Sequence, residues 1–94
     1  MKGSEKQIAW AEEIKERVIS ALNNEINKTN EESRTVTDKL AKALSEEDSA
    51  WRVINMFKDV RDGDAKRVSC DVIAQIRLNP LARDWAKNVL NYMG

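Results

Sequence analysis

Apolar positions recur at helical spacing along most of this chain, and the pattern is clearest at its beginning. From Glu5 to Ile26, isoleucine, valine, leucine, alanine and tryptophan return every three or four residues. This spacing places them on one half of a helical cylinder, with most of the charged side chains on the other half. Ser4 and Gln7 precede the stretch with the spacing of a capping box. The pattern predicts a long helix over about residues 5–27, whose apolar face is wide enough to need more than one partner helix.

The next segment, residues 27–35, is polar throughout and is followed by β-branched residues that weaken a helix. We therefore expect it to be a solvated connector. Thr37 has the character of an N-cap for a short helix over residues 38–44. Ser45 is followed by three carboxylates, which suit the first turn of another helix, so a third helix is expected over residues 46–61. One continuous helix over residues 38–61 is the alternative.

Two turn signals divide the second half of the chain. Gly63 can take the left-handed conformation that often ends a helix, and Asp64 can cap the helix that follows. Asn79 and Pro80 act together, because the proline ends one helix and suits the first position of the next, with the asparagine as its cap. The apolar spacing between and after these signals predicts helices over residues 65–78 and 80–93.

No stretch alternates apolar and polar residues over more than a few positions, which is the pattern of a half-buried strand. The fold class is therefore predicted to be all-α, a compact bundle of about five helices in which shorter helices pack on the long N-terminal one. The length of 94 residues suits a single domain, 1–94. A content of 41% hydrophobic and 34% charged residues is ordinary for a globular protein.

The segment GSEKQIAWAEEI, residues 3–14, resembles a segment that recurs in small uncharacterised proteins of bacteria, phages and mobile elements. Those proteins often carry Trp-Trp-Ile further along the chain. The matching place here is AWRVI, residues 50–54, where an arginine stands in place of the second tryptophan. The resemblance implies a prokaryotic, phage or plasmid origin, and it transfers no functional residue to this chain.

Charge and cysteine content narrow the classes of protein further. The 16 basic and 16 acidic residues cancel, so no overall field attracts nucleic acid or an anionic membrane. A single cysteine excludes an internal disulfide framework and is consistent with a reducing compartment. The first residues lack an apolar signal region, and no window approaches the length of a membrane span. We expect a cytoplasmic protein that does not enter a membrane.

The residues needed for common catalytic and metal sites are missing. The chain has no histidine, which removes the usual general base and the commonest metal ligand. Cys70 has no catalytic partner and is expected to pack in the core. The aspartates near Gly63 do not fit the spacing of a calcium loop, and three scattered glycines cannot form a phosphate loop. We therefore expect no enzymatic activity, no cofactor and no metal site.

Five side chains remain as candidates for binding a partner. The acidic candidates lie on the polar face of the first predicted helix and suit a basic partner surface. The aromatic candidates lie at the margins of their apolar stripes, where a tryptophan can anchor an interface. The third tryptophan, Trp85, is expected in the core. The candidate residues are Trp10, Glu12, Glu13, Glu16 and Trp51.

Together these features favour a protein that binds another macromolecule. The leading hypothesis is a small phage or mobile-element factor that binds and modulates a host protein, including an inhibitor of the anti-CRISPR type. The alternative is a helical nucleic-acid-binding module, in which one of the last two helices enters a groove. A homodimer is compatible with both hypotheses. The basic residues available for nucleic acid are Lys66, Arg67, Arg77, Arg83 and Lys87, interrupted by Asp71 and Asp84.

Overall fold

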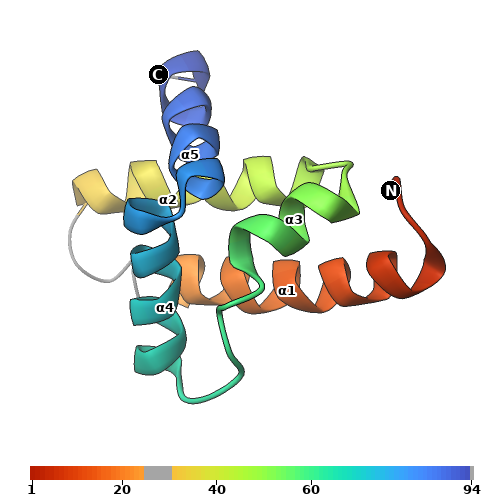
Figure 1. Cartoon of the computed structure of the whole chain (residues 1–94). Coiled ribbons are helices and arrows are strands. Elements are labelled where there is room, and N and C mark those ends of the chain that lie inside the picture. Colours follow the sequence, from red (N-terminus) through yellow and green to blue (C-terminus); the bar gives the residue numbers. More distant parts are fainter. Residues whose placement is uncertain (25–30, 94) are drawn as a thin grey trace.

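The computed structural model describes residues 1–24 and 31–93. Within these ranges the chain forms helices and connecting turns without any β-strand, which confirms the all-α bundle (Figure 1). The end of the first predicted helix, residues 25–27, lies outside the described residues, as does the polar segment up to residue 30. The five helices are α1 (Glu5–Asn24), α2 (Glu31–Glu46), α3 (Ala50–Phe57), α4 (Ala65–Leu78) and α5 (Pro80–Met93).

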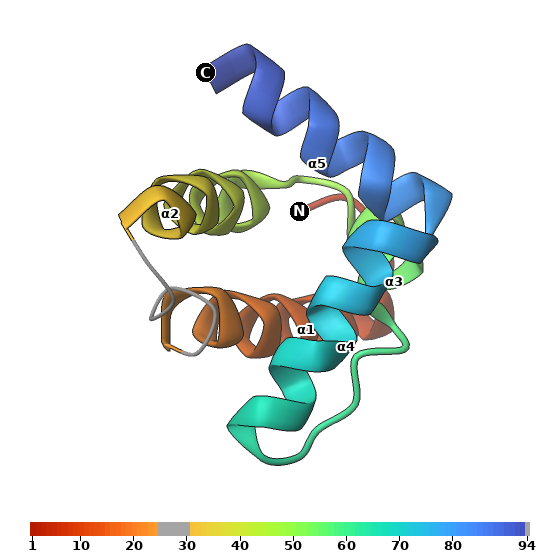
Figure 2. The same ribbon diagram turned by 90° about the vertical axis from the view of Figure 1, so that its left-hand side faces the viewer.

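Helix α1 is the base on which the bundle is built. Its inner face carries Ala11, Ile14, Val18 and Leu22, all of which are buried. Helices α2, α3 and α4 all pack against it, so the wide apolar face has three partners, as expected. Figure 2 shows α2 lying between α1 and α5. No helix in the described part of the chain is both long enough and apolar enough to cross a membrane.

Helices α1 and α3 run side by side in the same direction (Figure 1). At the start of both, the segment before α1 pairs with the segment before α3. The amide of Lys2 donates to the Asp48 carbonyl oxygen at 2.7 Å, and the amide of Ala50 donates to the Lys2 carbonyl oxygen at 3.0 Å. Gly3 has a φ of 145°, and a Cβ on it would lie 3.0 Å from the Cβ of Ala50. The contact therefore needs a glycine.

Helix α2 begins earlier than the sequence predicted. Residues 31–35 are helical, although they were expected to belong to a solvated connector. Thr37 is not an N-cap but a buried residue inside the helix, and its hydroxyl donates to the Arg34 carbonyl oxygen at 3.1 Å. Thr37 shares a buried face of α2 with Leu40, Ala41 and Leu44. Burial of this face outweighs the weak helix propensity of the β-branched residues at positions 35–37.

The break between α2 and α3 also differs from the prediction. Ser45 lies in the last turn of α2 instead of starting a helix, and its hydroxyl donates to the Lys42 carbonyl oxygen at 2.6 Å. Helix α3 starts at Ala50, where Ser49 is the cap and accepts a hydrogen bond from the Arg52 amide at 3.3 Å. The helix ends at Phe57, short of the predicted residue 61. A continuous helix over residues 38–61 is wrong, because the chain leaves the helix between α2 and α3.

A buried lysine from α1 holds this break in place. Lys15 is only 7% exposed, and its Nζ donates to the carbonyl oxygens of Ser45 at 3.3 Å and Glu47 at 2.6 Å. These carbonyls lie at and just beyond the end of α2, where a helix has unpaired acceptors and a partial negative charge. The Lys15 ammonium group thus caps the C-terminal end of α2 and attaches this end to α1 by hydrogen bonds.

The junction between α4 and α5 follows the sequence prediction. The Oδ1 of Asn79 accepts from the Leu81 amide at 3.0 Å and so caps α5. Its Nδ2 also donates to the carbonyl oxygens of Asn55 at 2.9 Å and Met56 at 3.1 Å, near the end of α3. One side chain therefore starts α5 and attaches the junction to α3.

Other expected local features are present, with one exception. In the capping box, the Gln7 amide donates to Ser4 Oγ at 3.2 Å and the Ser4 amide donates to Gln7 Oε1 at 3.1 Å. Asp64 caps α4 by accepting from the Arg67 amide at 3.0 Å. Gly63 does not adopt the expected left-handed conformation, since Gly3 has the single positive φ among the described residues.

Candidate partner-binding surface

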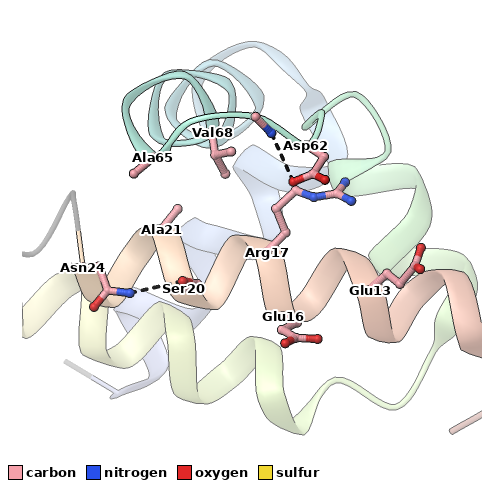
Figure 3. Close-up of a pocket in the computed structure, with 10 residues that line it drawn as sticks. Glu13, Glu16, Arg17, Ser20, Ala21, Asn24, Asp62, Ala65 and Val68 are labelled. Carbon is pink, nitrogen blue, oxygen red and sulfur yellow. Dashed lines mark hydrogen bonds between the residues drawn. The ribbon is translucent and has the colours of Figure 1, made fainter.

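A groove of about 440 Å³ lies between the outer face of α1 and the beginning of α4 (Figure 3). One wall is α1, and the opposite wall is the turn after α3 together with the first turn of α4. We call this the α1–α4 groove. It is lined by Glu13, Glu16, Arg17, Ser20, Ala21, Asn24, Asp62, Gly63, Ala65 and Val68.

The α1 wall consists of one stripe of the helix. Positions 13, 17, 20 and 24 follow one another at spacings of three and four, so their side chains lie along the same face. The Nδ2 of Asn24 donates to Ser20 Oγ at 3.1 Å, which orders the far end of the stripe. Glu13 and Glu16 are exposed at the near end.

The opposite wall is held in place by hydrogen bonds across and within the turn. Figure 3 shows Arg17 extending from α1 toward the turn that holds Asp62. The Nη1 of Arg17 donates to the Val60 carbonyl oxygen at 2.8 Å. Asp62 Oδ1 accepts from the Gly63 amide at 3.1 Å, which leaves the second carboxylate oxygen available. A hydrogen bond therefore links the two walls of the groove.

The charge of the groove is acidic and its deeper lining is apolar. Three carboxylates, from Glu13, Glu16 and Asp62, share the groove with one cation, Arg17. Ala21 and Val68, from α1 and α4, are buried at 5% and 6% exposure and supply apolar lining. A long side chain with an apolar stem and a cationic end matches this arrangement.

Two tryptophans extend the surface beyond the groove. Trp10 is 47% exposed and continues the stripe of Glu13 and Arg17 toward the start of α1. Trp51 is 58% exposed and follows Ala50, which contacts the segment just before α1. Trp10 therefore lies in the second turn of α1 and Trp51 in the first turn of α3, and the segments that precede these two helices are hydrogen-bonded to each other. We call Trp10, Trp51, Glu13 and Glu16, together with the α1–α4 groove, the α1 surface.

The third tryptophan belongs to the core, as the sequence predicted. Trp85 is 5% exposed, and its ring meets that of Phe57 edge to face with centroids 5.8 Å apart. This is a favourable aromatic geometry. Trp85 therefore packs in the core, whereas Trp10 and Trp51 are exposed on the surface.

Only two of the three predicted acidic residues lie in the groove. Glu13 and Glu16 line the groove, whereas Glu12 is exposed outside it. Sequence reasoning missed Arg17 and Asp62. The spacing between Glu13 and Arg17 placed the arginine on the same face of α1, so its position was accessible from the sequence. Asp62 was not, because only the packing of α4 on α1 brings the turn to the groove.

Chemically reactive features are few in the described residues. Cys70 is exposed and unpaired, which corrects the expectation that it packs in the core. No group of three or more histidine, cysteine, aspartate or glutamate side chains in residues 1–24 and 31–93 is arranged to hold a metal ion. The five basic residues of α4 and α5 are all exposed.

Comparison with known proteins finds no relative: no family model, curated protein or solved structure matches this chain.

Proposed function

We propose that this is a non-enzymatic protein that binds another protein through its α1 surface. The observation that carries the proposal is the exposure of Trp10, one helical turn before the groove-lining Glu13, and of Trp51 on α3, while Trp85 is buried. A small domain gains stability by burying tryptophan, whereas exposed tryptophans next to a concave region are typical anchors of protein interfaces.

The resemblance of the N-terminal segment suggests the biological setting. We propose a small phage or mobile-element factor that binds and modulates a host protein. An inhibitor of the anti-CRISPR type is the specific form that we favour. The acidic lining of the α1–α4 groove supports this form, because a negative surface complements protein surfaces built to hold nucleic acid. Such an inhibitor acts in the cytoplasm of the host.

Affinity capture with matched variants tests the proposal. The wild-type protein serves as bait in lysates of candidate bacterial hosts, beside the double variant Trp10→Ala/Trp51→Ala. The control is Leu78→Ala, which removes an exposed apolar side chain that does not line the groove. We expect the wild type and the control to retain the same protein and the double variant to lose it. A partner retained equally by all three baits contradicts the proposal.

Binding to nucleic acid through α4 and α5 is the competing function, favoured by the exposure of all five basic residues there. Asp71 and Asp84 lie on the same helices and oppose it. A salt titration separates the two functions, because phosphate contacts lose affinity steeply with ionic strength. Strong binding of DNA or RNA at about 50 mM salt that falls steeply on salt addition would favour the competing function.

A further inference from the structure

We propose that the α1–α4 groove receives an arginine side chain of the protein partner. This inference rests on the proposed function and adds the chemistry of the contact. The protein partner presents an arginine to the groove, while an adjacent part of the same partner covers Trp10.

The charges of the groove favour a cationic guest. Glu13 and Glu16 on α1 and Asp62 in the facing turn are among the residues that line the groove, so acidic residues come from both walls. Arg17 is the one cation in the lining, and its Nη1 already donates to the Val60 carbonyl oxygen. The lining therefore has an excess of negative charge that an incoming cation can offset.

The shape of the groove favours a long, partly apolar side chain. Ala21 and Val68 line it with apolar atoms, and Ala65 adds a methyl group from the first turn of α4. The three-carbon stem of an arginine can pack on these atoms while its charged end meets the carboxylates. Among the two long cationic side chains, arginine is preferred, because its planar guanidinium binds carboxylates with two parallel hydrogen bonds and loses less hydration on binding.

Trp10 supplies a second recognition element for the same partner. It precedes Glu13 by one helical turn on the same stripe of α1, and nearly half of its surface is accessible. An indole face attracts a guanidinium through its negative electrostatic potential and also packs against apolar side chains. The surface thus suits an arginine-bearing segment that crosses from the groove onto Trp10.

A peptide titration followed by amide chemical shifts tests the inference. The probe is a short amidated peptide with two arginines, and the control is the same peptide with neutral citrulline in place of each arginine. We expect the arginine peptide to shift the amides of Glu13, Glu16, Gly63 and Val68, and the citrulline peptide to leave them unchanged. Equal shifts with both peptides, or shifts confined to amides outside the groove, overturn the inference.

Matched variants of α1 sharpen this test. Glu13→Gln/Glu16→Gln removes two groove carboxylates without changing side-chain size, and we expect the arginine peptide to bind about fivefold to tenfold more weakly. Glu12→Gln removes the same charge from the same helix outside the groove, and its affinity should match the wild type. Equal weakening by Glu12→Gln shows a general field effect and contradicts a specific site. A well-dispersed amide spectrum verifies that each variant is folded.

The captured partner separates failure of this inference from failure of the proposed function. If Trp10→Ala/Trp51→Ala loses the partner while Glu13→Gln/Glu16→Gln keeps it at full affinity, the α1 surface binds a protein but not through an arginine in the groove. If both double variants keep the partner at full affinity, the proposed function fails as well. Loss of the partner in both supports both statements.

Discussion

The guanidinium of Arg17 donates a hydrogen bond to the carbonyl oxygen of Val60 at 2.8 Å, and this bond joins the two walls of the α1–α4 groove. The donor belongs to α1 and the acceptor to the segment between α3 and α4. A charge-assisted hydrogen bond therefore links the two segments across the groove.

Replacing Arg17 should loosen the groove and destabilise the fold. Arg17→Met keeps much of the apolar stem and removes the hydrogen bond, so we expect the free energy of unfolding in urea to fall by about 1–2 kcal/mol. Amide hydrogen exchange over residues 61–64 should become faster. Lys66→Met removes an exposed cation elsewhere in the neighbourhood and should leave both measurements within error. Unchanged exchange in Arg17→Met contradicts the structural role assigned to this bond.

The two turn glycines should respond differently to alanine. Gly3 has a φ of 145° and no space for a Cβ beside Ala50, so Gly3→Ala should lower the free energy of unfolding by about 1–3 kcal/mol. Gly63 has an ordinary backbone conformation, and its Cβ would meet Arg67 Cδ at 3.4 Å. Gly63→Ala should therefore change stability by less than about 1 kcal/mol. Equal effects of the two substitutions in thermal unfolding would refute this distinction.

Asn79 should stabilise the fold through two separable contributions, the cap of α5 and the hydrogen bonds to the end of α3. Asn79→Ser keeps a side-chain oxygen that can cap α5 but removes the Nδ2 donor to the Asn55 and Met56 carbonyls without placing a charge beside them, and we expect a loss of about 1 kcal/mol. Asn79→Ala removes the cap as well and should lose about 2 kcal/mol. Urea unfolding of both variants and of Asn88→Ala, an exposed asparagine within α5, provides the comparison. A full loss already in Asn79→Ser would mean that the cap contributes nothing.

The tryptophans should separate cleanly by fluorescence and by stability. In Trp10→Phe/Trp51→Phe, the remaining Trp85 should emit at shorter wavelength than the wild type and resist quenching by iodide, because it is buried against Phe57. Each exposed tryptophan should change stability by less than about 0.5 kcal/mol on replacement by phenylalanine. Trp85→Ala should lose about 3–5 kcal/mol. Efficient quenching of Trp85 would contradict the core packing.

Local signals in the sequence predicted most of the helix ends. Ser4 with Gln7, Asp64, and Asn79 before Pro80 each form the expected cap, because a cap depends on residues within one turn of each other. The predicted start at Ser45 failed for a non-local reason. Lys15 binds the carbonyl oxygens of Ser45, in the last turn of α2, and of Glu47, and only residues 47–49 separate α2 from α3.

The sequence predicted the α1 side of the candidate surface but not the facing wall. Helical spacing placed Glu13 and Glu16 on the polar face of α1 and Trp10 at the margin of its apolar stripe, because one helix fixes their relation. The facing wall with Asp62 depends on how α4 packs against α1, which no local pattern encodes. The same limitation explains Thr37, which is buried by tertiary packing although its local sequence favours a cap.

The placement of α3 along α1 also has a consequence for the order of folding. The bonds from Lys15 to Glu47 and from Arg17 to Val60 span 32 and 43 residues, so α1 is completed by segments far along the chain. Most of the stability of a helix in a protein comes from the packing of its apolar face, which for α1 is supplied by α2, α3 and α4. Closing such long loops slows folding relative to bundles with only local contacts. Helix α1, although first in the chain, should therefore become fully ordered only when the middle of the chain has docked on it.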